Sequence, residues 1–433
     1  MNKINNKVAI VVDSKTGWGH LFEGLRIGKE LYDNDVPFIF LAHPGKSRKL
    51  FEKYRDFWGL EADFIPFDYI YDPLKKYNPA ELRQCFNKFD PFLKSSYLKE
   101  FICYNNQKVI QTILNTSVAI TDILPIVSYL RRGTTNPTVS IARTDFWKLR
   151  YPELNHQIRK WIWRQIVKHL LSRDSIIQNC ILFNPDYLNN LRSRARIYDA
   201  TIFPFPAKSR KKMESKEKIR DVIEDLFGFK EFLLLTFGGV GMKRQAVQLS
   251  QKIDLIAKDI EYPILVVGEG NERFRNKGEY GSFKHMNYLG RPINLHDYIS
   301  TAEGVISKRG YGTLTECVTN GTPLMMYCEG APEGKLNMET YKLFLNLPHG
   351  FYKSNFVISR VSDLFELKEK INNMLRQKDL FLRATKCRNN QIGDFKEKEV
   401  NFIKSLWDDN EEYSDTIEEF QALYEDKLAV SGE

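Results

Sequence analysis

Short apolar runs alternate with longer amphipathic segments along most of this chain. Residues 7–13 (KVAIVVD) form a compact run rich in β-branched side chains, which predicts a buried strand. After the turn SKTGWGH, apolar residues such as Leu21, Leu25 and Leu31 recur at helical spacing, and a second strand is expected at 37–41. Further buried strands are expected at 232–236, 264–267, 302–306 and 323–327. This alternation is Rossmann-like and predicts an α/β fold with parallel sheets.

Residues 307–323 (SKRGYGTLTECVTNGTP) carry the most specific pattern in the chain. They predict a strand end, a glycine-rich turn and a helix start capped by Thr313. Gly310 and Gly312 let the backbone approach a ligand, and the free N–H groups and dipole of the helix suit an anionic diphosphate. Glu316, one turn into the helix, could accept hydrogen bonds from both hydroxyls of a ribose. The alternative is an ordinary connection in which the glycines only reverse the chain.

A second glycine turn lies near the N-terminus. Gly17 and Gly19 clear space around His20, which is expected at or near the start of a helix. Because open α/β sheets bind ligands at this edge, His20 is a candidate catalytic residue, with a structural or solvated histidine as the alternative. The turn lacks a full G-x-G-x-x-G motif, and no acidic residue ends the strand at 37–41, so the pattern argues against a dinucleotide site.

Several motifs occur together in the two halves of the chain. The C-terminal half has TFGGVG (236–241), YLGRP (288–292) and SKRGYGTLTE followed by GTP, and the N-terminal half has GWGH, TDILPIVSYL and NPTVSIARTDFW. With them the chain resembles, over roughly residues 7–380, the GT-B glycosyltransferases, in particular the group of the peptidoglycan lipid-linked N-acetylglucosamine transferase and the UDP-glycosyltransferases. The resemblance implies two Rossmann-like domains facing across a cleft, with a C-terminal helix at 395–407 that crosses back to the N-terminal domain.

Length and composition agree with two domains. A chain of 433 residues exceeds a usual single core. Pro204 and Pro206 stop regular structure, and the lysine-rich run after them is typical of an exposed linker. We therefore expect an acceptor-binding domain at 1–206, a basic linker at 207–222, a nucleotide-sugar-binding domain at 223–385, and the crossing helix with an acidic tail at 386–433.

The resemblance implies transfer of a sugar from a nucleotide sugar, expected to be a UDP-sugar, to an acceptor hydroxyl. In an inverting transfer the hydroxyl attacks the anomeric carbon as the diphosphate leaves, so the site needs a base and groups that stabilise the leaving charge. In the UDP-glycosyltransferases a histidine of this glycine loop pairs with an aspartate after a later strand, and the matching residues are His20 and Asp122. Asp13 is a rival partner for His20, and Asp122 could equally be a turn residue.

The donor site is expected, by resemblance, in the C-terminal domain. Glu316 would bind the ribose, the main chain around Arg291 the base, and Glu339 with Asn337 the sugar. The expected donor-binding residues are Gly238, Gly239, Lys243, Arg291, Ser307, Gly310, Tyr311, Gly312, Thr313, Glu316, Asn337 and Glu339. The expected acceptor-loop residues are Gly17, Gly19, Asp145 and Trp147. The segment 327–340 (YCEGAPEGKLNMET) departs from the usual acid followed directly by Gln or Asn, which leaves open whether the sugar is a hexose or an N-acetylhexosamine.

The sequence disfavours retention of configuration and a metal. Many retaining GT-B enzymes have a second glutamate eight positions before the ribose-binding one, and this chain has Lys308 there. The D-x-D motif of metal-dependent GT-A enzymes appears only as Asp33-Asn34-Asp35, in a helix-to-strand turn where solvated aspartates are common. We expect an inverting enzyme with no metal and no cofactor besides its nucleotide-sugar co-substrate.

The net charge of +9 hides an asymmetry. Residues 408–427 contain nine acidic residues and one lysine, so the rest of the chain is strongly basic. Such a surplus suits phosphate-bearing partners, among them sugar nucleotides, anionic lipid headgroups and nucleic acid. Because the chain has no recognisable nucleic-acid module and its cations are spread out, no nucleic-acid partner is expected.

No segment approaches the roughly 18 consecutive apolar residues of a membrane span, and the first residues do not form a signal peptide. A cytoplasmic location is therefore expected. The helix at 156–173 (HQIRKWIWRQIVKHLLSR) places tryptophans beside cations, which suits peripheral contact with the inner face of a membrane, and a core-facing amphipathic helix is the alternative. The six cysteines form no C-x-x-C pair and are expected to be free buried thiols.

Two other functions fit the same pattern. A sugar-nucleotide epimerase of the same fold would need acid and base groups around the sugar ring, which Glu329, Glu333 and Glu339 could supply. A non-catalytic GT-B partner subunit would bind nucleotide without using His20. Epimerised product formed from a UDP-sugar alone distinguishes the first from a transferase, and an unaffected His20 variant distinguishes the second.

Overall fold

The structure is a computed structural model, and it divides the chain into two compact units. Residues Met1–Ile202 and Asp394–Glu433 form the first unit, and Phe203–Gly393 form the second. The parts of the chain that the structure describes are residues 6–12, 18–67, 107–121, 125–131, 134, 136–143, 175–179, 196–198, 215–236, 243–267, 283–290, 295–308, 311–327, 356–358, 363–392 and 395–408.

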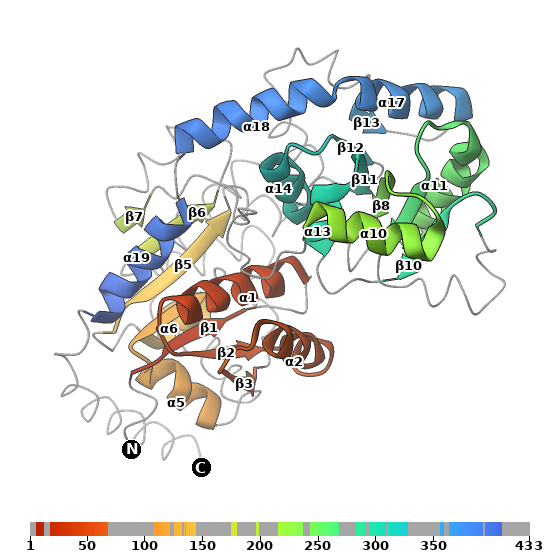
Figure 1. Cartoon of the computed structure of the whole chain (residues 1–433). Coiled ribbons are helices and arrows are strands. Elements are labelled where there is room, and N and C mark those ends of the chain that lie inside the picture. Colours follow the sequence, from red (N-terminus) through yellow and green to blue (C-terminus); the bar gives the residue numbers. More distant parts are fainter. Residues whose placement is uncertain are drawn as a thin grey trace, which may run out of the picture. The chain divides into compact units, whose positions relative to one another are not determined.

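The first unit contains a parallel sheet of seven strands in the order β3-β2-β1-β4-β5-β6-β7 (Figure 1). The strands are β1 (Val8–Val11), β2 (Phe38–Ala42), β3 (Asp63–Pro66), β4 (Val118–Thr121), β5 (Thr138–Arg143), β6 (Ser175–Asn179) and β7 (Arg196–Tyr198). Its described helices are α1 (Trp18–Asp33), α2 (Lys46–Trp58), α5 (Gln107–Asn115), α6 (Pro125–Leu130) and α19 (Phe395–Asp408). Every residue of β1, β2 and β4 is buried, because helices cover both faces of a parallel sheet.

Helix α1 packs very close to this sheet because two of its residues lack side chains. A Cβ atom on Gly24 would lie 2.7 Å from Cγ1 of Val12, and one on Gly28 would lie 2.7 Å from the ring of Phe38. Leu21, Leu25 and Leu31 on the same helix are buried, which confirms the predicted amphipathic helix. The close packing holds α1 against β1 and β2. It therefore also fixes the position of the start of α1, where His20 lies.

The C-terminal helix α19 returns to the first unit. It follows α18 of the second unit in sequence, but it contacts α1 and β4, and Ile403 is fully buried. The prediction of a crossing helix at 395–407 is therefore confirmed, and the observed helix is one residue longer.

The second unit contains a parallel sheet of six strands in the order β10-β9-β8-β11-β12-β13. The strands are β8 (Leu233–Thr236), β9 (Ile264–Val267), β10 (Asn287–Gly290), β11 (Gly304–Lys308), β12 (Leu324–Tyr327) and β13 (Val357–Ile358). The described helices are α10 (Lys216–Phe227), α11 (Lys243–Ile256), the 3₁₀ turn η4 (Ala257–Asp259), α13 (Leu295–Thr301), α14 (Tyr311–Asn320), α17 (Leu364–Arg376) and α18 (Lys378–Ile392). The strands expected at 232–236, 264–267 and 323–327 are confirmed to within one residue.

One strand boundary was predicted wrongly. The apolar run 302–306 was expected to be the strand, but β11 runs from Gly304 to Lys308. Ser307 and Lys308 continue the ladder because Ser307 pairs with Thr236 on one side and Lys308 with Tyr327 on the other. Pairing with two neighbouring strands extends β11 into polar residues that hydrophobicity alone would exclude.

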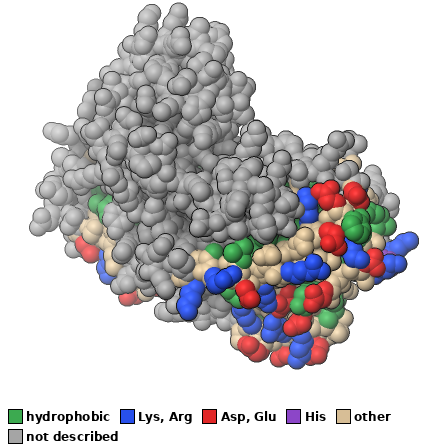
Figure 2. Space-filling model, turned by 90° about the horizontal axis from the view of Figure 1, so that it is seen from above, with side chains coloured by type: hydrophobic (Ala, Val, Ile, Leu, Met, Phe, Trp, Pro, Cys, Tyr) green, Lys and Arg blue, Asp and Glu red, His purple; other side chains and the backbone are tan. Residues whose placement is uncertain are grey.

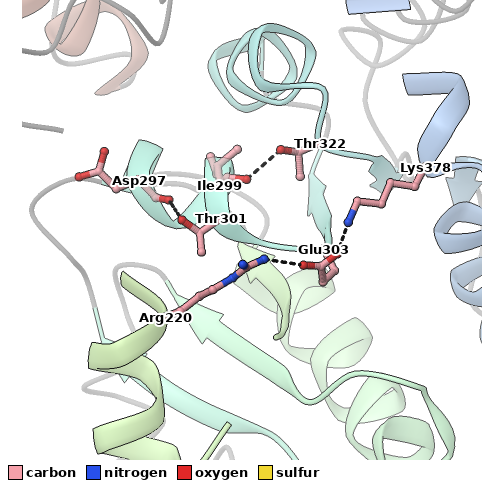
Figure 3. A network of polar contacts seen from close by, with 7 residues as sticks. All are labelled: Arg220, Asp297, Ile299, Thr301, Glu303, Thr322 and Lys378. Carbon is pink, nitrogen blue, oxygen red and sulfur yellow. Dashed lines mark hydrogen bonds and ion pairs between the residues drawn. The ribbon is translucent and has the colours of Figure 1, made fainter. Parts of the chain in front are cut away.

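A polar network fixes the start of β11. The carboxylate of Glu303 is 6% exposed, and it accepts hydrogen bonds from Arg220 of α10 (3.2 Å) and from Lys378 of α18 (Figure 3). Burial lowers the pKa of the Lys216 ammonium, and the nearby charges of Arg220 and Lys378 lower it further. Close by, Thr322 donates to the carbonyl oxygen of Ile299 at 2.9 Å. The network joins two helices to the central strand of the sheet.

We expect Glu303→Ala to lower the free energy of unfolding by about 1–2 kcal/mol, because it leaves Arg220 and Lys378 without their carboxylate. The loss is less than for a fully buried pair, since these cations are 32% and 46% exposed and can turn toward water. The matched control is Glu366→Ala, whose carboxylate is 55% exposed beside Lys370 and should cost about 0.5 kcal/mol or less. Urea unfolding of the full chain measures both, and equal losses would contradict the network's role.

Charges are mixed on the surface in view in Figure 2. Among the described residues of that face, basic and acidic side chains are interspersed. Elsewhere on the surface, Lys230 forms ion pairs with Asp221 (3.2 Å) and Glu224 (3.1 Å). The described part of the face therefore carries no extended patch of one sign. Among the described helices, none is both long and apolar enough to cross a membrane.

Candidate functional site

Each sheet has one point where its strand order reverses. In the second unit, β8 leads through α11 to β9 on one side, whereas its other neighbour, β11, leads through α14 to β12 on the opposite side. The chain segments that follow β8 and β11 leave from the same edge of the sheet. Open α/β sheets bind ligands in the crevice at the carboxyl ends of these two strands. The segments that follow these two strands in sequence, 237–242 and 309–310, contain the glycines of the predicted donor site and are therefore the candidate ligand-binding segments.

The carboxyl ends of β8 and β11 carry neighbouring hydroxyl groups. Thr236 and Ser307 are paired across the two strands, and both are 0% exposed. The Oγ atom of Ser307 has no hydrogen-bond partner among the residues that the structure describes. Lys308, the last residue of β11, is only partly buried and brings a cation to the same edge. In the sequence Lys308 is evidence against retention, and its position directly before the glycine turn is the signal that also identifies it as a residue of this edge.

Helix α14 begins directly after the glycine turn. It starts at Tyr311, so the prediction that Thr313 caps it is wrong, and Thr313 lies within the first turn. A Cβ atom placed on Gly312 would meet no atom of the described residues within 4 Å, which leaves open space beside that turn. The free N–H groups and the positive end of the helix dipole at this end favour an anion.

Glu316 is the sixth residue of α14 and is partly buried. Its carbonyl oxygen accepts a hydrogen bond from the side chain of Asn320 at 2.8 Å, which is a bond within the helix. The neighbouring Cys317 is fully buried, and burial raises the pKa of its thiol well above the usual range, with the charge of Glu316 raising it further. Cys317 therefore stays protonated, as expected for a free buried thiol.

In the first unit the strand order reverses between β1 and β4. These strands are paired, with Val11 opposite Thr121. His20 is the third residue of α1, which follows β1 in sequence, and Asp122 is the residue directly after β4. His20 and Asp122 therefore follow, in sequence, the two strands β1 and β4 that flank this switch point. The position of His20 near the helix start is confirmed.

The D-x-D sequence has an ordinary structural role. Asp33 is the last residue of α1 and forms an ion pair with Lys29 one turn earlier. Asp35 has a φ angle of 60°, which is typical of a turn residue. Among the described residues, no three His, Cys, Asp or Glu side chains lie close enough together to hold a metal ion.

Part of the predicted site lies outside the described residues. The residues concerned are Gly17, Asp13, Asp122, Asp145, Trp147, Gly238, Gly239, Arg291, Gly310, Glu329, Glu333, Asn337 and Glu339, together with the helix expected at 156–173. For Gly19, His20, Lys243 and Tyr311 the structure describes the position in a helix and no more. The described members of the donor site are Ser307, Gly312, Thr313 and Glu316, which all lie on β11 or α14.

Comparison of the whole structure with solved structures gives matches over almost its full length. Glycosyltransferase VinC in complex with dTDP is 10% identical, with a TM-score of 0.58, 93% of this chain and 99% of that chain covered. Os79 from O. sativa in complex with UDP is 13% identical, with a TM-score of 0.57 and coverage of 93% and 100%. The chain has the GT-B glycosyltransferase fold.

Another GT-B neighbour is Arabidopsis thaliana UGT89C1 complexed with UDP-L-rhamnose, with 11% identity, a TM-score of 0.55 and coverage of 93% and 98%. No family model matches the chain, and no curated protein matches its sequence. At 10–13% identity these likenesses establish the fold, with two parallel α/β sheets as predicted. They leave the activity to be argued from the site.

Proposed function

We propose that this protein is an inverting, metal-independent glycosyltransferase that moves a hexose or N-acetylhexosamine from a UDP-sugar to an acceptor hydroxyl. One observation carries the proposal. The strand order brings β8 and β11 together at a switch point, and β11 leads through a glycine turn into α14, which bears Glu316. A diphosphate fits the first turn of that helix, and a ribose fits a carboxylate one turn further on.

Each group of the donor would have its own partner. The N–H groups at the start of α14 and the open space beside Gly312 suit the diphosphate. Glu316 accepts hydrogen bonds from the ribose hydroxyls. The neighbours support a nucleoside diphosphate as ligand, since the structures of VinC, Os79 and UGT89C1 hold dTDP, UDP and UDP-L-rhamnose.

The reaction needs one proton transfer and one bond exchange. The acceptor oxygen attacks the anomeric carbon while its proton passes to His20, and the bond from that carbon to the diphosphate breaks with the electron pair on the leaving phosphate. Asp122, or Asp13 in its place, would stabilise the imidazolium that forms. The positive end of the α14 dipole and the free N–H groups of its first turn would stabilise the charge of the leaving group, which is the part a metal plays elsewhere.

A nucleotide panel tests this function. Thermal shift with UDP, dTDP, GDP and their sugars should give the largest rise in melting temperature for UDP or a UDP-sugar, because a ligand stabilises the folded state as it saturates. The matching UDP-sugar should then be consumed in the presence of an acceptor mixture, and activity should persist in EDTA. Epimerised product without acceptor would favour the epimerase, and binding without turnover would favour a partner subunit.

Gly312→Leu should abolish nucleotide binding without harming the fold. A Cβ atom at position 312 meets nothing within 4 Å, and leucine is a better helix former than glycine, so stability should stay equal or rise by about 1 kcal/mol. The leucine then fills the space that the diphosphate needs, and we expect the Kd for UDP to rise at least about 100-fold, which is about 2.7 kcal/mol. Isothermal titration measures the Kd.

Gly228→Ala is the matched control for this variant. Gly228 ends α10 with a φ angle of 80°, where alanine is strained, so this change should lower stability by about 1 kcal/mol and leave UDP binding unchanged. If Gly312→Leu binds UDP as the wild type does, the ligand does not lie at the start of α14.

The location of the protein is a separate proposal. We propose a cytoplasmic protein that contacts the inner face of a membrane through residues 156–173, which lie outside the described residues. Co-flotation with vesicles that contain anionic lipid tests this contact, and a protein that remains entirely in the unbound fraction contradicts it.

A further inference from the structure

Among the residues that the structure describes, Ser307 carries the one buried hydroxyl group without a hydrogen-bond partner. Its residue is 0% exposed, and its Oγ atom has no hydrogen-bond partner among the described residues. A buried polar group without a partner destabilises a folded protein, so such groups are rare and call for an explanation. Ser307 is also three positions before the first glycine of the turn that leads into α14.

Other buried hydroxyl groups of the same region are paired. Ser300 donates to the carbonyl oxygen of Asp297 at 2.8 Å. Thr301 donates to the same oxygen at 2.8 Å, and Thr322 donates to the carbonyl oxygen of Ile299 at 2.9 Å (Figure 3). Ser300, Thr301 and Thr322 are each 4% exposed, which is close to the burial of Ser307. Burial in this unit therefore does not by itself deprive a hydroxyl of a partner.

The side chain of Ser307 lies on the face of the sheet that α14 covers. A Cβ atom on Gly304 would lie 2.8 Å from Met374 of α17, so even-numbered positions of β11 face α17 and Ser307 faces the other side. Right-handed crossovers place α11 and α14 on opposite faces, because the connections β8-α11-β9 and β11-α14-β12 run in opposite directions along the sheet. Since α11 packs against α17, α14 covers the face of Ser307.

We propose that the hydroxyl of Ser307 is a hydrogen-bond donor to a phosphate oxygen of the bound nucleoside diphosphate. The proposal rests on the donor site proposed above. Ser307 lies at the same end of the sheet as the first turn of α14, beside Thr236 at the end of β8, where the diphosphate would sit. The ribose has its own candidate partner in Glu316, further along the helix. A hydroxyl that donates to a charged oxygen makes a stronger bond than a neutral pair.

The hydroxyl of Ser307 is covered by the surrounding protein in this structure. Because Ser307 has no exposed surface, phosphate binding includes a local rearrangement at the end of β11 that brings the two groups together. The unpaired hydroxyl is then a cost of the ligand-free state that the diphosphate removes. A hydroxyl needed only for folding would have the opposite effect on stability when it is deleted.

Ser307→Ala tests the proposal through two readouts that should move in opposite directions. The melting temperature of the ligand-free protein should be unchanged or higher, because no hydrogen bond is lost. The Kd for UDP should rise about tenfold or more, as expected for the loss of a charge-assisted hydrogen bond, and binding of uridine, which has no phosphate, should not change. Differential scanning fluorimetry and isothermal titration on the full chain give both quantities.

Ser300→Ala is the matched control. This serine is nearly as buried, but its hydroxyl is bonded to Asp297, so its loss should lower the melting temperature and leave the Kd for UDP unchanged. A lower melting temperature with unchanged UDP binding in Ser307→Ala would overturn the role of Ser307 alone. If the wild type itself binds neither UDP, dTDP nor pyrophosphate, the proposed function fails as well, so the two failures are distinguishable.

Discussion

His20→Ala is expected to lower kcat about 100- to 10,000-fold, because the acceptor hydroxyl then has no positioned base. The Kd for UDP should stay at the wild-type value, since His20 belongs to the first unit and the donor site to the second. Steady-state kinetics with a saturating donor, together with titration of UDP, measures both effects. A partner subunit would instead show no change in its function.

The pH profile of the wild type gives a second readout for His20. Its imidazole accepts a proton only when neutral, so kcat/KM should fall toward acidic pH as the imidazole becomes protonated. The control is His285→Ala, an exposed histidine on the second unit whose backbone N–H, unaffected by the change, donates to Asp254 at 2.9 Å. If both variants retain full activity, His20 is not the base.

Arg131→Met is expected to destabilise the first unit by about 3–5 kcal/mol. Arg131 is 2% exposed, and its guanidinium donates to main-chain oxygens at the end of α5 and before β4 and β5. The acceptor atoms are the carbonyl oxygens of Ile113 (2.5 Å), Thr116 (2.9 Å), Ser117 (3.2 Å) and Pro137 (3.0 Å), and the hydroxyl of Thr116 (3.2 Å). The cation also meets the negative end of the α5 dipole. Methionine fills a similar volume but leaves these buried oxygens without their donor.

Urea unfolding measures this loss, and hydrogen exchange of the β4 and β5 amides assigns it to the first unit. The matched control is Arg48→Met, because Arg48 is 62% exposed and pairs with Glu52 at 2.9 Å, so its loss should cost about 0.5 kcal/mol or less. Similar losses in the two variants would mean that the buried guanidinium contributes little to the stability of the sheet.

The strands were largely predictable from the sequence. The buried polar interactions of Arg131 and Glu303, which join other elements to the sheets, were not. The run 264–267 coincides with β9 because parallel strands are buried on both faces and therefore read as continuous apolar segments. Arg131 and Glu303 gave no such signal. Their partners lie up to 18 and 83 residues away, and charged residues in sequence are expected on the surface. Only the folded chain shows that they join separate elements.

The candidate site divides in the same way. The glycine turn and Glu316 are predictable from local sequence, because the residues that form an anion-binding site at a helix start are consecutive in the chain. The helix start was misplaced, since Thr313 is a good cap residue but Tyr311 already begins α14. The unpaired hydroxyl of Ser307 depends on the pairing of β11 with β8 and on what α14 covers, which no local pattern contains.

The most direct test of the account is a crystal structure of the full chain soaked with UDP. We predict electron density for the diphosphate at the first turn of α14, with the ribose hydroxyls within hydrogen-bond distance of the Glu316 carboxylate. Density for UDP at any other edge of the two sheets, with Glu316 remote from the ribose, would contradict the account.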